Sequence, residues 1–146
     1  MELSARASYF TGLTVFSTFG ATIAAILGGW DSSIQTLVGF MAVDYVLGVI
    51  IALFWHVSPK SKDGTFESDA SFQGLLRKGC ILLVVYVAAR LDLLFCDGQF
   101  IRTAVILFFI ANEGFSIIEN IGIMGVPMPQ IVKDAFAAIK KQSDQK

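Results

Sequence analysis

The stretch that decides the fold runs from Arg102 to Met124 and reads RTAVILFFIANEGFSIIENIGIM. Its first half, residues 104–111, contains only apolar side chains. A run of roughly 20 predominantly apolar residues is what a helix needs to cross the hydrocarbon core of a bilayer. The pattern therefore predicts a transmembrane helix over residues 100–124.

The second half of this stretch carries a patch of polar side chains. Helical spacing places Asn112, Ser116 and Glu119 near one face, with Glu113 and Asn120 beside them. An ionisable group inside a bilayer costs roughly 2.5–3.5 kcal/mol on insertion scales, so such groups usually face a partner helix or water. We expect this face to carry function. Glu119 and Asn120 also fit a second interpretation, in which they mark the end of the helix at the headgroups.

The composition indicates an integral membrane protein. Of the 146 residues, 55% are hydrophobic and 16% are charged, whereas a soluble domain carries about a quarter charged residues. A net charge of −1 gives no basic field for nucleic acid. His56, Cys80 and Cys96 are too few for a metal cluster or a disulfide framework, and we expect no cofactor. The sequence contains neither a Ser/His/Asp set nor a glycine-rich phosphate loop, so no motif in it indicates an enzyme.

Residues 8–29 form a first candidate span, without a charge between Arg6 and Asp31. A helical wheel lines up four hydroxyl side chains opposite a bulky apolar face: Thr11, Thr14, Thr18 and Thr22. Three interpretations remain. The hydroxyl face is a wall of an aqueous pore, or it lets helices pack closely in the membrane. Alternatively, the helix lies on the membrane instead of crossing it.

Residues 34–57 form the second candidate span, and its middle carries a carboxylate. Asp44, Gly48 and Ala52 follow at four-residue steps, so Asp44 stands at the end of a small-residue groove into which another helix can press. We interpret Asp44 as an assembly contact. The other interpretation is a proton- or ion-sensing group, because carboxylates within a membrane also serve proton relays.

The polar residues 58–74, with proline and glycine breakers, predict a solvated loop, and residues 75–96 predict the next span. Near the end of that span lie Arg90 and Asp92. Asp92 and Arg102 stand at equal distances from Asp97, which makes them natural partners across a helical hairpin. Arg90 could instead reach Asp44, because a guanidinium on a long side chain can travel several ångströms.

Residues 130–141 predict a short amphipathic helix lying on the inner leaflet, where its lysines meet anionic lipid. With four spans, nine of the eleven cations share one side, which is then the cytoplasm: Arg6, Lys60, Lys62, Arg77, Lys78, Lys133, Lys140, Lys141 and Lys146. If residues 8–29 do not cross the membrane, three spans remain and Arg6 is the only cation that moves to the outer side. We therefore expect an all-α protein of three to four transmembrane helices in hairpins, with a cytoplasmic C-terminus.

The order of these features resembles the toxin-secretion/phage-lysis holin family over roughly residues 28 to 141. The resemblance rests on six short motifs: Gly28-Gly29-Trp30-Asp31; Asp44-Tyr45 with Gly48; Phe72-x-Gly74-Leu75 before Arg77-Lys78; Leu91-Asp92; Asn112-Glu113-Gly114 with Ser116-Ile117 and Glu119-Asn120; and Gly125-Val126-Pro127-x-Pro129. Two positions depart from the family pattern. Val46-Leu47 stands where the family has Ile-Thr, which removes a hydroxyl near Asp44, and Arg90 is not typical of the family.

The resemblance implies a protein that permeabilises the bacterial inner membrane and releases an endolysin or a protein toxin. A protomer of three or four helices encloses no large hole, so such a pore has to be a ring of copies of this chain in the lipid bilayer. Two other classes fit the same composition. One is a small ion or proton channel or transporter subunit, and the other is a structural scaffold or holin antagonist.

Overall fold

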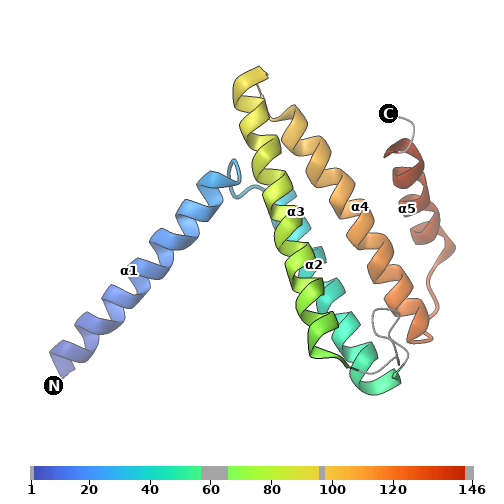
Figure 1. Cartoon of the computed structure of the whole chain (residues 1–146), viewed down its shortest axis with the longest axis horizontal. Coiled ribbons are helices and arrows are strands. Elements are labelled where there is room, and N and C mark those ends of the chain that lie inside the picture. Colours follow the sequence, from blue (N-terminus) through green and yellow to red (C-terminus); the bar gives the residue numbers. More distant parts are fainter. Residues whose placement is uncertain (1, 57–65, 96–97, 144–146) are drawn as a thin grey trace.

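The structure is a computed structural model that describes residues 2–56, 66–95 and 98–143. The helices are α1 (Glu2–Ile26), α2 (Ser32–Ile50), the π-helical turn η1 (Ile51–Trp55), α3 (Ser68–Phe95), α4 (Phe100–Ile123) and α5 (Gln130–Ser143). Helices α2, α3 and α4 run side by side as a bundle, in which α4 contacts both α2 and α3 (Figure 1). The expected all-α architecture is confirmed.

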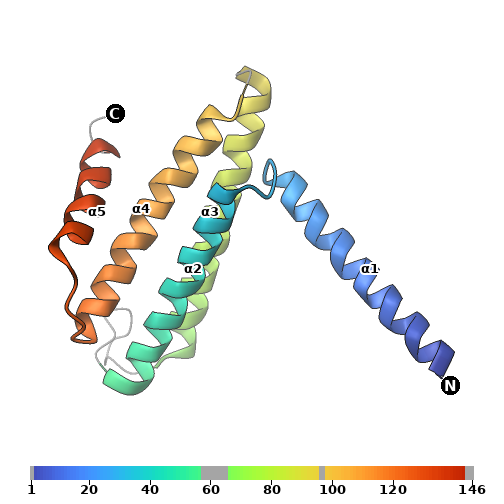
Figure 2. The same cartoon turned by 180° about the vertical axis from the view of Figure 1, so that it is seen from behind.

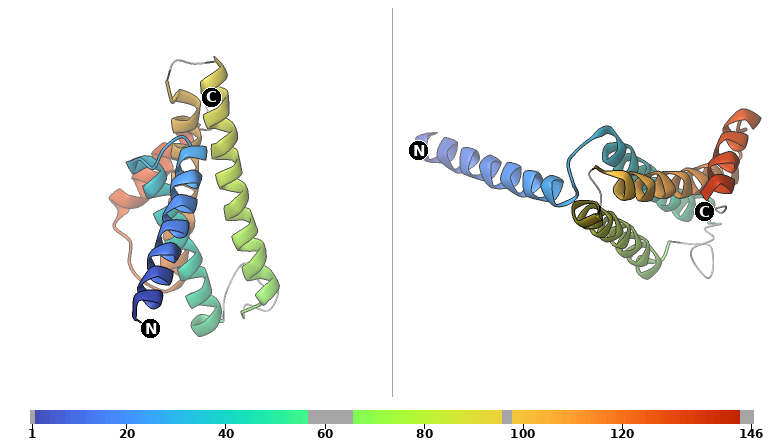
Figure 3. Two further views of the ribbon diagram at one scale, coloured as in Figure 1. Left: turned by 90° about the vertical axis from the view of Figure 1, so that its left-hand side faces the viewer. Right: turned by 90° about the horizontal axis from the view of Figure 1, so that it is seen from above.

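Helix α1 projects away from this bundle, while α5 folds back beside α4 (Figure 2). The top view in Figure 3 shows α1 leaving the bundle on the side opposite to α5. Between Arg6 and Ile26 no side chain is buried and only Ala24 is half-buried. Helix α1 therefore packs against nothing along most of its length within one copy of the chain.

Among the residues that the structure describes, three helices are long and apolar enough to cross a membrane: Arg6–Ile26, Ser32–Trp55 and Phe100–Ile123. The span expected at residues 75–96 falls on α3, which is long enough but carries Lys78, Arg90 and Asp92 among its apolar residues. Position 96 itself lies outside the described residues. Helix α3 runs alongside α2 and α4, the two apolar spans of the bundle (Figure 1).

Three ends of the predicted segments need correction. Helix α1 ends at Ile26, so residues 27–29 of the span expected at 8–29 are not helical, because Gly28 and Gly29 adopt φ +84° and +116°. Helix α3 begins at Ser68, so the last seven residues of the loop expected at 58–74 are helical; residues 57–65 lie outside the described part of the chain. The N–H of His56 donates to the carbonyl of Ile51 at 3.1 Å, and His56 has a left-handed backbone with φ 51°. The second span therefore ends at Trp55, in a π-helical turn.

The apolar core occupies the half of the bundle near the α1–α2 and α3–α4 turns. It consists of buried side chains from the first turn and three helices: Leu27, Ile34, Leu37, Met41, Ile81, Val85 and Ile106. The other half of the bundle, toward the ends of α2 and α4, holds polar side chains in its interior. This half of the bundle brings Asp44 of α2, Lys78 of α3 and Glu113 of α4 together.

Candidate functional site

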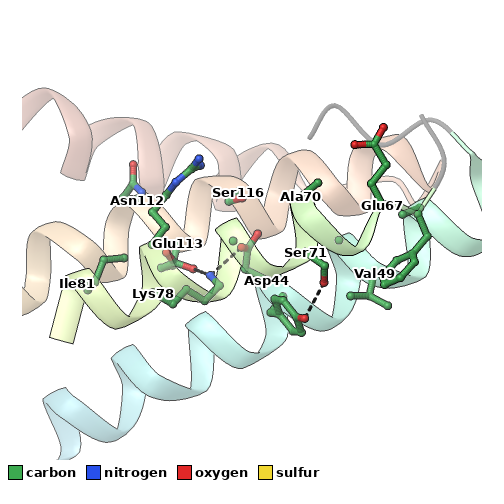
Figure 4. A pocket seen from close by; sticks show the side chains of 16 residues that line it. Asp44, Val49, Glu67, Ala70, Ser71, Lys78, Ile81, Asn112, Glu113 and Ser116 are labelled. Atoms are coloured by element: carbon green, nitrogen blue, oxygen red, sulfur yellow. Dashed lines mark hydrogen bonds and ion pairs between the residues drawn. The ribbon is translucent and has the colours of Figure 1, made fainter. Parts of the chain in front are cut away.

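A lysine from α3 joins two carboxylates inside the bundle. The Lys78 ammonium donates to Asp44 of α2 at 2.9 Å and to Glu113 of α4 (Figure 4). The side chains of Lys78, Asp44 and Glu113 are 12%, 4% and 6% exposed. We call these three residues the charged triad. It links all three helices of the bundle through a single ammonium group.

Asn120 extends this network by two turns along α4. Its side-chain amide donates to the Asp44 carboxylate at 3.0 Å, and Asn120 is 3% exposed. Glu113 and Asn120 stand seven residues apart in α4, which at helical spacing places them on the same face. Asp44 is thereby held by a cation from α3 and an amide from α4.

The triad carries one positive and two negative groups, so its formal charge is −1. Buried charges require a partner and further hydrogen bonds, because removing an ion from water costs several kcal/mol after relaxation of the protein. Removing one partner from such a group typically costs 3–5 kcal/mol, whereas replacing all of them with well-packed neutral groups can be close to neutral. Lys78 is therefore the residue on which the burial of both carboxylates depends.

A cavity of about 150 Å³ lies beside the triad. Figure 4 shows side chains from α2, α3 and α4 pointing into it, among them Ser71, Asn112 and Ser116. The hydroxyls of Tyr45 and Ser71 lie 2.7 Å apart, which joins α2 to α3 at the wall of the cavity. Within residues 2–56, 66–95 and 98–143, no group of three His, Cys, Asp or Glu side chains could hold a metal ion.

A second polar centre holds the turn between α1 and α2. Arg102 of α4 is 1% exposed, and its guanidinium donates to the carbonyls of Leu27 and Gly29 at 2.6 and 3.0 Å. It also donates to the Asp31 carboxylate at 2.5 Å and to Gln99 at 3.0 Å. The planar guanidinium with its fixed N–H groups suits such a set of acceptors. Arg102 therefore fixes the turn from which α1 departs.

Asp92 completes this end of the bundle. Its carboxylate accepts the backbone N–H groups of Ile101 and Arg102 at 2.8 and 2.7 Å. The first N–H groups of a helix have no intrahelical acceptor, so a carboxylate placed there stabilises the start of α4. Asp92 and Arg102 do meet across the hairpin, but through the Arg102 backbone and not through its guanidinium.

Asp31 shows the electrostatic effect of Arg102 outside the apolar spans. Its partial burial raises the pKa, but the hydrogen bond and the charge of Arg102, with backbone N–H groups of Ile34 and Ser33, outweigh it and lower the pKa below 3.8. The Asp31 carboxylate also accepts the N–H of Ile34 at 3.0 Å, as the N-terminal cap of α2. Asp31 therefore joins the start of α2 to α4.

The four threonines of α1 bond to their own helix. Each hydroxyl donates to the carbonyl four residues earlier, at 2.9 Å for Thr11 and 2.8 Å for Thr14, Thr18 and Thr22. All four side chains are exposed. A hydroxyl that donates in this way still has lone pairs that accept hydrogen bonds. This face of α1 therefore offers acceptors to whatever lies against it.

Comparison with known proteins decides the family of this chain. Residues 21–141 match the model of the bacteriophage holin family. The chain belongs to this family. The match covers the turn fixed by Arg102, the three-helix bundle with its triad, and most of α5, so it includes every feature described above except most of α1.

Relatives of this holin-family chain occur in bacteria and in a phage. An uncharacterised protein of Clostridium perfringens is 37% identical over 87% of this chain and 89% of its own length. A probable holin of Bacillus phage phi105 is 36% identical over 71% of each chain. An uncharacterised protein of Listeria monocytogenes is 31% identical over 87% of this chain and 85% of its own length. No solved structure is significantly similar to this chain.

Membership in the holin family confirms the resemblance seen in the sequence, and with the apolar helices it makes the chain a membrane protein. It implies oligomerisation in the membrane and suggests a non-enzymatic role.

The structure brings together most of the polar residues singled out from the sequence of this holin-family chain. Asp44, Glu113 and Asn120 meet in the network, while Gly48, Asn112 and Ser116 line the cavity. Glu119 is exposed on α4 and lies outside the network. Of the two residues considered as markers of the helix end, only Glu119 has the exposure that this interpretation requires.

The partner of Arg90 and the position of Lys78 differ from the sequence-based expectation. The Arg90 guanidinium lies 5.4 Å from the ring centroid of Tyr86, its neighbour one turn earlier on α3, while the cation bound to Asp44 is Lys78. Lys78 was expected only among the cations on the cytoplasmic side. Its spacing from Ile81 and Val85, three and seven residues on, places it on the buried face of α3 and is the signal that identifies it.

Proposed function

We propose that copies of this chain assemble in the bacterial inner membrane into a ring that opens a lesion and releases an endolysin or a protein toxin from the cytoplasm. The observation that carries the proposal is the exposure of α1, an apolar helix of membrane-spanning length that packs against nothing along most of its length in its own bundle. Such a protomer completes its packing only with lipid or with other copies. Membership in the holin family supports the same conclusion.

In this proposal the bundle is the rigid part of each copy, and α1 is the part that meets neighbours and water. Its uncharged threonine face, Thr11, Thr14, Thr18 and Thr22, lines the lumen of the open lesion, because its hydroxyl oxygens can accept hydrogen bonds from water. The bulky face of α1 meets lipid or the adjacent copy. The protein acts without catalysis, and its C-terminal helix α5 lies on the cytoplasmic side, with its apolar face at the inner leaflet.

Weak contacts repeated between copies suit a lesion that opens abruptly. Polar contacts between helices in a membrane contribute only about 0.6–2 kcal/mol each. A few of them hold no stable dimer at low density, whereas a closed ring repeats every contact around its circumference. Opening then depends on how many copies the membrane holds.

The test is to induce this chain alone in a bacterium and to follow membrane potential together with the escape of cytoplasmic reporters of graded size. The proposal expects an abrupt loss of potential and the appearance of folded, enzyme-sized reporters outside the cell. Leakage of ions or protons alone would contradict the proposal and would indicate a small channel. If this chain does not lyse cells and instead protects cells that express another holin, the proposal is wrong and the chain is a holin antagonist.

The lumen assignment has its own test. Replacing the four threonines with leucine keeps α1 apolar and helical, and we expect membrane insertion to be unchanged while lysis is lost. A matched variant with Tyr9, Leu13, Phe16 and Ile23 replaced by other large apolar residues controls for changes of α1 that leave the threonine face intact. Unchanged lysis after the threonine replacements would contradict the lumen assignment.

A further inference from the structure

The cavity beside the charged triad exposes polar groups that have spare hydrogen-bonding capacity. The Lys78 ammonium has three N–H donors and gives one each to Asp44 and Glu113, which leaves one. The amide of Asn112 and the hydroxyl of Ser116 have no hydrogen-bond partner in the part of the chain that the structure describes. At the depth of a membrane such groups need a partner that lipid tails do not supply.

The cavity is partly open. Its exposed lining residues are Phe66 just before α3, Arg77 of α3 and Asn112 of α4, and Ser116 is half-buried one turn from Asn112. Because Arg77 and Asn112 are exposed on facing helices, we take the approach between α3 and α4 as the entrance for a second helix. The contact of Tyr45 with Ser71 joins α2 to α3 on another side. A side chain that enters the cavity from outside therefore meets Asn112 and Ser116 before it reaches the triad.

The threonine face of α1 fits this opening in its chemistry. Its hydroxyls have given their hydrogens to their own helix, so they present acceptors to the donors of Lys78 and Asn112. The face carries no charge and only medium-sized side chains, which lets two helices approach closely in a membrane.

The threonines of α1 and the residues of the cavity also lie at similar distances along their helices from the Arg102 end of the bundle. Helix α1 ends, and α2 and α4 begin, at the end of the bundle that Arg102 holds, and in Figure 1 the first turns of α1 lie toward the level of the opposite end. At a rise of about 1.5 Å per residue, Thr14 lies about 18 Å and Thr11 about 22 Å from the end of α1 at Ile26. By the same measure Asp44 lies about 18 Å along α2, and Glu113 and Ser116 lie about 20 and 24 Å along α4.

Within one copy, α1 cannot reach this cavity. The Arg102 guanidinium holds the turn at Leu27, Gly29 and Asp31, and from this turn α1 leads away from the bundle (Figure 3). A second copy in the same membrane presents its own α1, whose threonines lie at matching distances along the helix from the Arg102 end. The cavity is therefore complete only when a neighbouring copy contributes to it.

We propose that the threonine face of α1 from one copy docks into the cavity between α3 and α4 of a second copy, with Thr11 next to Ser116 and Thr14 next to the triad. The inference rests on the proposed function in taking copies to meet in one membrane. It describes the closed assembly, since the face that docks is the face that lines the open lesion. Opening requires α1 to leave its neighbour's cavity.

The experiment co-expresses two full-length copies with different affinity tags, with Cys80 and Cys96 replaced by serine in both. One copy carries Thr11→Cys and the other carries Ser116→Cys, and membranes are oxidised with copper phenanthroline before the time of lysis. We expect a disulfide-linked pair carrying both tags, formed several-fold more than with either of two controls. Tyr9→Cys has nearly the depth of Thr11 but the opposite face, and Thr22→Cys has the same face but lies close to the turn.

The same cells give a second readout. Oxidised cells should fail to lyse, because α1 cannot leave the cavity, and dithiothreitol should then restore lysis. Equal cross-linking of all three cysteine positions, or lysis that continues in cross-linked cells, would overturn the docking. Lysis by the reduced pair tests the proposed function separately, because a chain that never lyses cells can still form or fail to form the specific cross-link.

Discussion

The side chain of Arg102 closes over the backbone of Gly28. A Cβ atom at Gly28 would lie 2.9 Å from both Cδ and Nε of Arg102 and 3.3 Å from Cβ of Ala89. Gly28 also has φ +84°, in the left-handed region that other residues rarely adopt. The contact with Arg102 and the backbone conformation both require glycine at this position, so the turn between α1 and α2 depends on one residue in each of two distant segments.

Replacing Gly28 with alanine should therefore destabilise the protein more than the same change one residue later. The left-handed backbone costs roughly 1–2 kcal/mol in either case, and displacing Arg102 adds about 1–3 kcal/mol for Gly28→Ala. Gly29→Ala is the matched control, because Gly29 has φ +116° and open space around its Cα. Thermal unfolding in detergent measures the difference. Equal losses for the two variants would show that Arg102 moves aside freely.

Replacing Arg102 with lysine should weaken the turn although the charge is kept. Lysine has no planar guanidinium group, so its ammonium cannot donate to all four acceptors of Arg102 together: Leu27, Gly29, Asp31 and Gln99. We expect a loss of about 2–4 kcal/mol, since hydrogen bonds to charged groups contribute about 1.5–3 kcal/mol each. Spin labels on α1 and α4 should also report a broader distance distribution. Arg90→Lys, on the exposed face of α3, is the control and should change neither measurement.

Replacing Lys78 with methionine should destabilise the bundle by about 3–5 kcal/mol, because Asp44 and Glu113 remain buried without their cation. Lys133→Met removes the same charge from an exposed site on α5 and should have little effect. Combining Lys78→Met with Asp44→Asn and Glu113→Gln removes all three charges and should recover part of the loss. Thermal unfolding in detergent measures each variant. A triple variant less stable than Lys78→Met alone would contradict this account.

The link between Asp31 and Arg102 should weaken in acid. Because the folded protein lowers the pKa of Asp31, the stability that this carboxylate contributes is fully present above its ordinary pKa of 3.8 and is lost as the pH falls through the lowered folded value. The Asp31 side chain is 40% exposed, so solvent screening keeps the effect modest. Unfolding measured from pH 6 downward should show a smaller pH dependence for Asp31→Asn than for the parent chain.

The sequence predicted where the helices lie and missed features that depend on partners in space. The spans near α1, α2 and α4 follow from runs of apolar residues, which need no knowledge of neighbours. The start of α3 at Ser68 was missed because residues 68–74 are mostly polar and show no apolar periodicity. A helix can include such residues when the rest of it is held by packing.

The polar centres show the same limit. The polar residues of α4 were identified because a carboxylate in an apolar run is costly wherever it lies. Lys78 was interpreted as a cation outside the membrane because it follows Arg77 beside a polar loop. Its role depends on Asp44, 34 residues earlier, and on Glu113, 35 residues later. Likewise, the backbone contact of Asp92 with Arg102 requires the geometry of the turn, which charge pairing alone does not give.

The hydroxyl hydrogens of the α1 threonines are all bonded within α1 itself. One consequence concerns the timing of lysis. A helix whose hydroxyls are already satisfied enters lipid at little cost, so newly made copies can collect in the membrane singly. In the assembly that we propose, the delay before lysis is set by the rate of synthesis, and a cell that makes the protein faster reaches the same threshold sooner without any change in the protein.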